Sequence, residues 1–176
     1  KTYRMFQLMH ELVARGTSRD RIIYLNMEDD RIRPMLAADM DLIIRGYHQM
    51  LPGGGKDPVY LFLDEVQAVP EWEFFVRRVL DTENRMRVFL TGSSSRLLSA
   101  EIATQMRGRS LATTILPFSF PELLRARGVC FPDHLSYRQH AHILGLLTEY
   151  QEYGGYPEVV IEPNDIIRHR TLHDIH

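Results

Sequence analysis

Residues 59–67, VYLFLDEVQ, form an apolar run that ends on two adjacent carboxylates, Asp64 and Glu65. A run this short, with β-branched and aromatic residues and Pro58 in front of it, is typical of a buried strand of a parallel sheet. Its acidic end would lie at the carboxyl edge of the sheet, where open α/β folds bind ligands. Two acids there suit Mg-nucleotide hydrolysis, in which one holds the metal and the next orients a water. Taken alone, the segment is better explained as a strand that ends in a solvated acidic turn.

The first residues of the chain favour the nucleotide-hydrolysis interpretation of these two acids over a solvated acidic turn. Lys1-Thr2 is followed by apolar residues at i, i+3, i+4 and i+7, which predict a helix over 2–15 that Gly16 ends. A Lys-Thr pair at the start of such a helix is typical of the end of a phosphate-binding loop, because the lysine reaches the β- and γ-phosphates and the hydroxyl joins the Mg²⁺ shell. The glycines of that loop are not in the sequence, so we expect a fragment whose first strand and glycine loop lie upstream.

Strand patterns and helix patterns alternate along most of the chain, which predicts a parallel α/β sheet. The expected strands are at 21–27, 59–64, 86–91 and 110–116, and the expected helices are at 34–50, from Pro70 on, and from the capping residue Ser119 to Arg127. From about residue 132 the pattern becomes helical and leads to a break at Gly154-Gly155. We therefore expect a core domain over 1–130 and a small helical subdomain over 131–176, leading to a further C-terminal domain.

Composition limits the classes of function. The 176 residues carry a formal net charge of -2, so a basic nucleic-acid-binding surface is not indicated by the average. The single cysteine excludes an intramolecular disulfide framework, which fits a reducing compartment. No apolar stretch is long enough to span a bilayer, and no secretory signal is visible. These features predict a globular, cytoplasmic protein without membrane partners.

Several motifs stand in a recognisable order: Lys1-Thr2, YLFLDEVQ at 60–67, LTGSSS at 90–95, RGR at 107–109, LPFSFPEL at 116–123 and GGYP at 154–157. In this order the chain resembles the additional-strand P-loop ATPases, and more narrowly the prokaryotic AAA-type ATPases that are often fused to a nuclease-like C-terminal domain of unknown function. The resemblance covers nearly the whole chain. It implies a P-loop NTPase parallel sheet sandwiched by helices, followed by a small helical subdomain.

The resemblance also implies a role for each motif. Lys1 would bind the phosphates, Thr2 and Asp64 the Mg²⁺, and Glu65 would be the base that orients water. The strand ending at Thr91 would lie between the absent phosphate-loop strand and the acidic strand, which makes Ser93 or Ser94 the γ-phosphate sensor. The remaining assignments are Arg109 as a charge stabiliser, acting within its own subunit or across an interface, and Pro157 near the adenine.

Each assignment has a structural alternative. Ser93 and Ser94 suit a Gly-Ser turn that exposes its hydroxyls to water, and Arg109 suits a surface ion pair. A Gly-Gly-X-Pro helix break needs no ligand to explain it. Glu28 and Asp29 follow a peripheral strand, and we interpret them as loop acids.

We thus expect an ATPase that uses ATP and Mg²⁺ and couples water attack on the γ-phosphate to a conformational change. The rival hypothesis is a nucleotide-gated binding module with little turnover, whose ATP state controls DNA or a protein partner through a segment beyond His176. A homo-oligomer is compatible with either function.

Overall fold

The computed structural model describes residues 1–51, 57–92, 109–129, 134 and 136–175. The chain divides into two compact units, Lys1–Thr113 and Thr114–His176. Within the described residues, no helix is both long enough and apolar enough to cross a membrane.

The first unit holds a parallel sheet that the described residues build from three strands in the order β1-β2-β3. Its elements, in chain order, are α1 (Thr2–Ala14), β1 (Ile22–Asn26), α2 (Asp41–Met50), β2 (Val59–Asp64), α3 (Trp72–Thr82) and β3 (Met86–Leu90), with 3-10 turns at Arg19–Arg21, Asp30–Ile32 and Val66–Ala68. In the sheet register Tyr24 pairs with Phe62, Asn26 with Asp64, and Phe62 with Phe89. The mixed α/β architecture with a parallel sheet is therefore confirmed.

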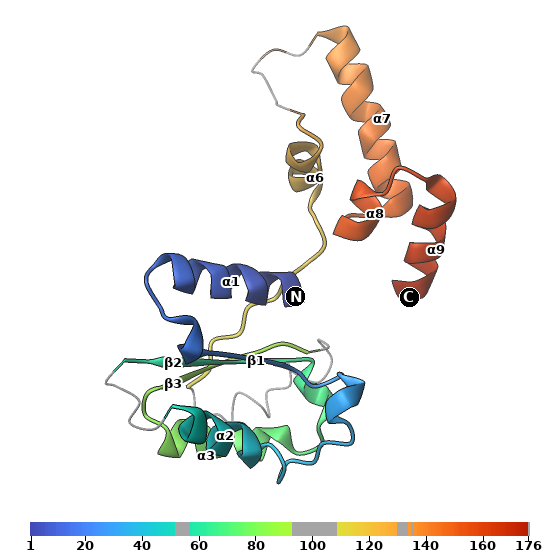
Figure 1. Cartoon of the computed structure of the whole chain (residues 1–176). Coiled ribbons are helices and arrows are strands. Elements are labelled where there is room, and N and C mark those ends of the chain that lie inside the picture. The colour runs from blue at the N-terminus through green and yellow to red at the C-terminus, as the bar shows by residue number, and fades with distance from the viewer. Residues whose placement is uncertain (52–56, 93–108, 130–133, 135, 176) are drawn as a thin grey trace. The chain divides into compact units, whose positions relative to one another are not determined.

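Helices cover both faces of this sheet. Helix α1 lies over one face, and α2 and α3 lie over the other (Figure 1). The α3 side is the larger core, in which Val59, Leu61 and Leu63 of β2 join the buried residues of α3, Trp72, Phe75, Val76 and Val79. The α1 side is aromatic: Phe62 stacks on Phe89 with ring centroids 4.6 Å apart, and Phe6 of α1 contacts Tyr24 at 5.3 Å. Because β2 is buried on both faces, its sequence is a continuous apolar run rather than an alternating one.

The second unit consists of helices in its described part: α6 (Phe120–Ala126), α7 (Tyr137–Tyr153), α8 (Pro157–Ile161) and α9 (Asp165–Ile175). Ser119 caps α6 through a capping box with Glu122, as expected, and Ser136 caps α7 through a box with Gln139. The core of this unit is the cluster Leu123, Leu124, Leu146 and Val160. Helix α6 packs there with α7 and α8, so it lies in the second compact unit, which begins at Thr114.

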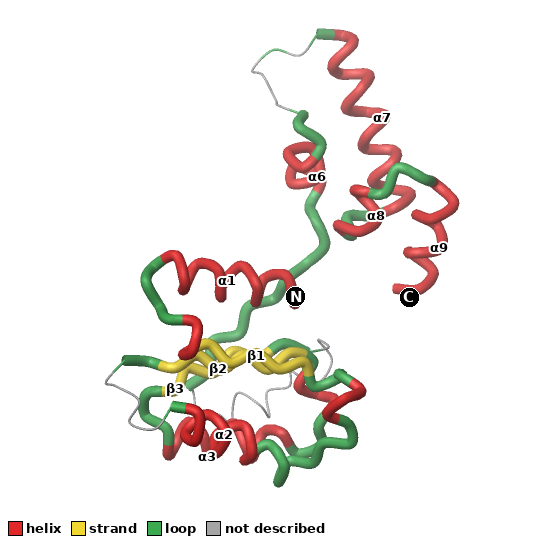
Figure 2. Tube along the Cα trace, in the orientation of Figure 1, coloured by secondary structure: helices red, strands yellow, loops and turns green. Residues whose placement is uncertain are grey.

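Two expected elements differ in the structure. Residues 110–116 form no strand and are exposed, and Figure 2 draws them as loop. Their Thr and Ile content suits a strand, but a strand also needs a partner with free backbone groups. The helix expected over 34–50 begins only at Asp41. Before it, Leu36 N–H donates to the Asp39 carboxylate at 3.0 Å and Asp39 N–H to the Leu36 carbonyl at 2.9 Å, a local turn that competes with helix.

Candidate functional site

The start of α1 and the ends of two strands meet at the carboxyl edge of the sheet. The Lys1 Nζ donates to the carbonyl oxygen of Gly92 at 2.9 Å, directly beyond the end of β3. Asp64 ends β2, and Thr91 after β3 contacts it through a hydroxyl hydrogen bond. The structure thus brings Lys1 and Asp64 to the same edge of the sheet, through Gly92 and Thr91.

Asp64 is a buried acid whose two oxygens are both hydrogen-bonded. Its exposed fraction is 1%. The Tyr24 hydroxyl donates to Oδ2 at 2.9 Å, and the Thr91 hydroxyl donates to Oδ1. Burial, together with the hydrogen bond and negative charge of Asp64, raises the pKa of Tyr24 to about 12, so Tyr24 remains a donor at neutral pH. Because an ionised carboxylate is costly to bury without such partners, the neighbouring strands on both sides supply what keeps Asp64 in place. A solvated acidic turn is thereby excluded for Asp64.

Glu65 is held by the backbone and by two polar neighbours. Its φ of 50° lies in the left-handed region, which is uncommon for a residue with a side chain and costs about 1–2 kcal/mol. Its N–H donates to the Thr91 hydroxyl at 3.1 Å, and its Oε2 accepts from Gln67 Nε2 at 2.6 Å. Thr91 therefore links the end of β3 to both acids at once.

These donors fit a magnesium ion that a nucleotide brings with it. Mg²⁺ keeps several waters and takes one or two carboxylates plus phosphate oxygens, so a single aspartate is an adequate protein ligand. Asp64 would supply the carboxylate, and Thr2, half-buried in the first turn of α1, would supply a hydroxyl oxygen. Among the described residues no group of three or more His, Cys, Asp or Glu forms a metal site of its own. The donor set thus suits a shared ion rather than an all-protein cage.

The other predicted site residues lie elsewhere. Ser93 and Ser94 fall outside the described residues. Arg109 donates to Asp81 at 2.6 Å in a half-exposed ion pair. Asp81 is in the last turn of α3, just before β3 begins, so this pair is at the opposite edge of the sheet from Asp64. The ion pair is the structural alternative that the sequence left open for Arg109.

Pro157 and the glycines before it belong to the second unit. Pro157 is exposed at the first position of α8, where a helix needs no N–H donor. Gly154 ends α7 with a φ of 70°, and the Gly155 carbonyl accepts from Phe118 N–H at 2.7 Å. The Gly154-Gly155 break is thus packed directly against the LPFSF segment at 116–120, although the two motifs are far apart in the sequence.

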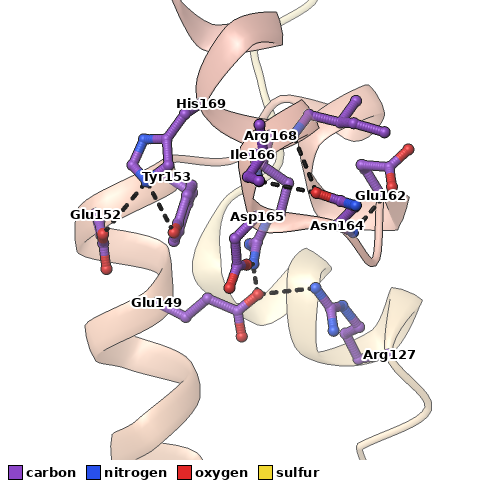
Figure 3. Close-up of polar contacts among 11 residues, drawn as sticks. Arg127, Glu149, Glu152, Tyr153, Glu162, Asn164, Asp165, Ile166, Arg168 and His169 are labelled. Carbon is purple, nitrogen blue, oxygen red and sulfur yellow. Dashed lines mark hydrogen bonds and ion pairs between the residues drawn. The ribbon is translucent and has the colours of Figure 1, made fainter.

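The second unit also contains a buried arginine. Arg168, 6% exposed, donates to Glu149 at 2.5 Å and lies 3.9 Å above the Tyr153 ring, while Arg127 donates to the same carboxylate oxygen at 2.9 Å (Figure 3). The Arg168 guanidinium also reaches Asp165 at 3.3 Å. One carboxylate therefore ties α6, α7 and α9 together, which is a structural task.

Sequence reasoning did not assign site roles to Tyr24, Thr91 or Gln67. The period of two places Tyr24 on one face of its strand, but only the register of the sheet brings its hydroxyl to Asp64. Glu28 and Asp29 are loop acids, as expected. Asp29 pairs with Arg31 at 2.5 Å, and hydrogen bonds from Arg31 hold the pKa of the Asp29 carboxyl far below its usual range.

A family model described as "AAA domain" matches residues 1–124. An uncharacterized protein of Methanocaldococcus jannaschii is 35% identical over 98% of this chain, and an uncharacterized protein of Haemophilus influenzae is 31% identical over 92% of it. The chain spans 36% and 38% of the lengths of these two relatives. No solved structure matches the chain.

The family match covers most of the chain, including the whole carboxyl-edge site. Its breadth agrees with the parallel sheet and with the resemblance drawn from the motifs. The chain belongs to the AAA domain family, a family of prokaryotic AAA-type proteins whose function is in general that of nucleotide-binding ATPases.

Proposed function

We propose that this chain is the core of an Mg²⁺-dependent ATPase, which hydrolyses ATP by water attack on the γ-phosphate and couples the reaction to a conformational change. The observation that carries the proposal is the meeting of Lys1, Asp64 and Glu65 at one sheet edge, joined through Thr91 and Gly92. Basic, metal-binding and water-orienting groups are the parts that phosphoryl transfer needs together.

Each side chain has a defined task in this proposal. The Lys1 ammonium, which now donates to a carbonyl, would donate instead to phosphate oxygens, a stronger charge-assisted bond. Asp64 and Thr2 would hold the Mg²⁺, which neutralises phosphate charge when bound. Glu65 would leave Gln67 and accept a proton from the attacking water, whose oxygen bonds to the γ-phosphorus as the bond to the ADP oxygen breaks. The roles of Ser93 or Ser94 as γ-phosphate sensor and of Pro157 near the adenine stay predictions from the motif resemblance.

The test compares two acids in similar backbone conformations. Glu65→Gln should leave ATP affinity within about twofold and slow hydrolysis by about a hundredfold or more, because a positioned general base contributes on the order of 10² to 10⁴. Glu71→Gln is the matched control, since Glu71 also has a positive φ of 60° but is exposed at the start of α3. Both are measured in the full-length protein. Unchanged turnover in Glu65→Gln would overturn the assignment of the base.

A second candidate is a nucleotide-gated switch for DNA or a protein partner, or for a homo-oligomer, with little turnover. The 2.6 Å hydrogen bond between Gln67 and Glu65 favours it, because a base that is already bonded is restrained from binding water. Gln67→Ala separates the two functions: release of Glu65 should raise the turnover of a switch, whereas an efficient hydrolase should gain nothing. Mg-ATP binding is required by both, so its absence would remove both.

A further inference from the structure

Tyr24 differs from the other aromatic residues on its face of the sheet in having a polar task. Phe62 and Phe89 fill that face with hydrocarbon, and Phe6 of α1 closes over Tyr24. A phenylalanine at 24 would keep this ring contact. The hydroxyl is explained by the 2.9 Å bond to Asp64, which lies diagonally across the strand pair, two residues beyond Phe62, the partner of Tyr24.

The environment of Asp64 makes that bond consequential. The carboxylate is 1% exposed, so water does not replace a missing donor. Thr91 holds Oδ1 and Tyr24 holds Oδ2, so the two hydroxyls fix the rotation of the carboxylate from opposite sides. Removing one of them frees the group to turn. Partners of this kind, one step behind a metal ligand, typically set metal affinity by 10- to 100-fold.

We infer that Tyr24 is a positioning residue: its hydroxyl orients the Asp64 carboxylate for the Mg²⁺ of the bound nucleotide, and its ring contact with Phe6 connects that carboxylate to α1, the helix that follows Lys1. The inference rests on the proposed function, because it requires that Asp64 bind the ion. It makes β1, which the motifs leave at the periphery of the sheet, part of the proposed magnesium site. Tyr24 acts through Asp64 and touches neither nucleotide nor metal.

The experiment measures Mg²⁺ binding apart from turnover. A fluorescent ATP analogue is titrated onto the full-length protein, first in EDTA and then with increasing Mg²⁺. Tyr24→Phe should raise the Mg²⁺ concentration at half-maximal response by about tenfold or more and leave affinity in EDTA unchanged. Tyr60→Phe is the matched control, since it removes a hydroxyl from the same face at the far end of β2. Its midpoint should stay within twofold of wild type.

Three other outcomes of this experiment would contradict the inference. A wild-type protein without Mg²⁺-dependent binding overturns the proposed function and this inference together. A midpoint that moves in Asp64→Asn but not in Tyr24→Phe overturns the inference alone. Loss of nucleotide affinity in EDTA together with a lowered unfolding temperature in Tyr24→Phe would assign Tyr24 a merely structural role. A further measurement needs no variant: the NMR chemical shift of the Tyr24 ring Cζ in the wild-type protein. This shift should change when Mg-ATP is added, whereas the shift of the Tyr60 Cζ should not. An unchanged Tyr24 signal contradicts the inference.

Discussion

Gly155 is the position at which a single methyl group should disrupt the second unit. A Cβ built on Gly155 would lie 1.9 Å from the carbonyl oxygen of Phe118 and 2.9 Å from its carbonyl carbon. Real Cβ contacts are not shorter than 3.0 Å, so Gly155→Ala must push the two segments apart by about 1 Å. The atoms that it meets are backbone, so no side-chain rotation relieves the contact.

The expected destabilisation follows from what that shift breaks. Overpacking at a tight contact costs about 1–3 kcal/mol. The hydrogen bond from Phe118 N–H to the Gly155 carbonyl, 2.7 Å long, would be stretched, and the bond from the Tyr150 hydroxyl to the Phe118 carbonyl, 2.9 Å long, would be weakened. Each contributes about 1 kcal/mol net. We therefore expect Gly155→Ala to lower the free energy of unfolding of the second unit by about 2–4 kcal/mol.

Hydrogen exchange of the α7 backbone amides measures this loss directly in the whole chain. At about 1.4 kcal/mol per tenfold, the exchange of peptides from 137–153 should accelerate by about 30- to 700-fold. Gly145→Ala is the matched control: it lies inside α7, exposed, with no atom within 4 Å of an added Cβ. There the same change should stabilise by about 0.5–1 kcal/mol and slow exchange. If Gly155→Ala slows exchange as well, the close approach of Gly155 to Phe118 is refuted.

Three further predictions concern charged groups. Hydrogen bonds from Ser119 hold the pKa of the Glu122 carboxyl below its ordinary value, so this stabilisation is present above the unfolded pKa and is lost as pH falls through the folded one; NMR titration should give a low midpoint that rises in Ser119→Ala. Arg168→Ala should destabilise the second unit by about 3 kcal/mol, measured by urea unfolding. The Arg168 side chain is only 8% exposed, and its loss removes one of the two arginine partners of the Glu149 carboxylate. Arg109→Ala should lower ATP turnover more than ATP affinity if the guanidinium stabilises charge, whereas equal loss of both indicates that its pair with Asp81 is structural.

The sequence predicts what is local and misses what depends on a distant partner. Strand β2 was predictable because a strand that is buried on both faces has a continuous run of apolar residues, which is visible in the sequence. The prediction of a strand at 110–116 was wrong. A high content of β-branched residues does not tell whether a neighbouring strand has a free edge with which the segment can pair. The α6 helix itself was predicted from its Ser119 cap. Its place in the second unit was not, because that place depends on packing against Leu146, far along the chain.

The site divides in the same way. The acids and the Lys-Thr pair could be read as motifs, since each is a short string with a chemical meaning. The hydroxyls of Tyr24 and Thr91 could not, because each reaches Asp64 across a strand pair and depends on register. The nearest signal was the period of two, which places Tyr24, Phe62 and Asp64 on one face once the strands are aligned.

The burial of Asp64 is itself an argument for function. Taking a carboxylate out of water costs several kcal/mol, and two hydroxyl bonds at about 1.5–3 kcal/mol each do little more than offset that cost. An apolar side chain would fill the same position on β2 at no such cost, as Leu61 and Leu63 do on the other face. Stability therefore does not explain the aspartate, nor the two neighbouring strands that each supply it with a donor. The proposed cation at the carboxyl edge would explain them, because it would reward a negative charge held there in one orientation.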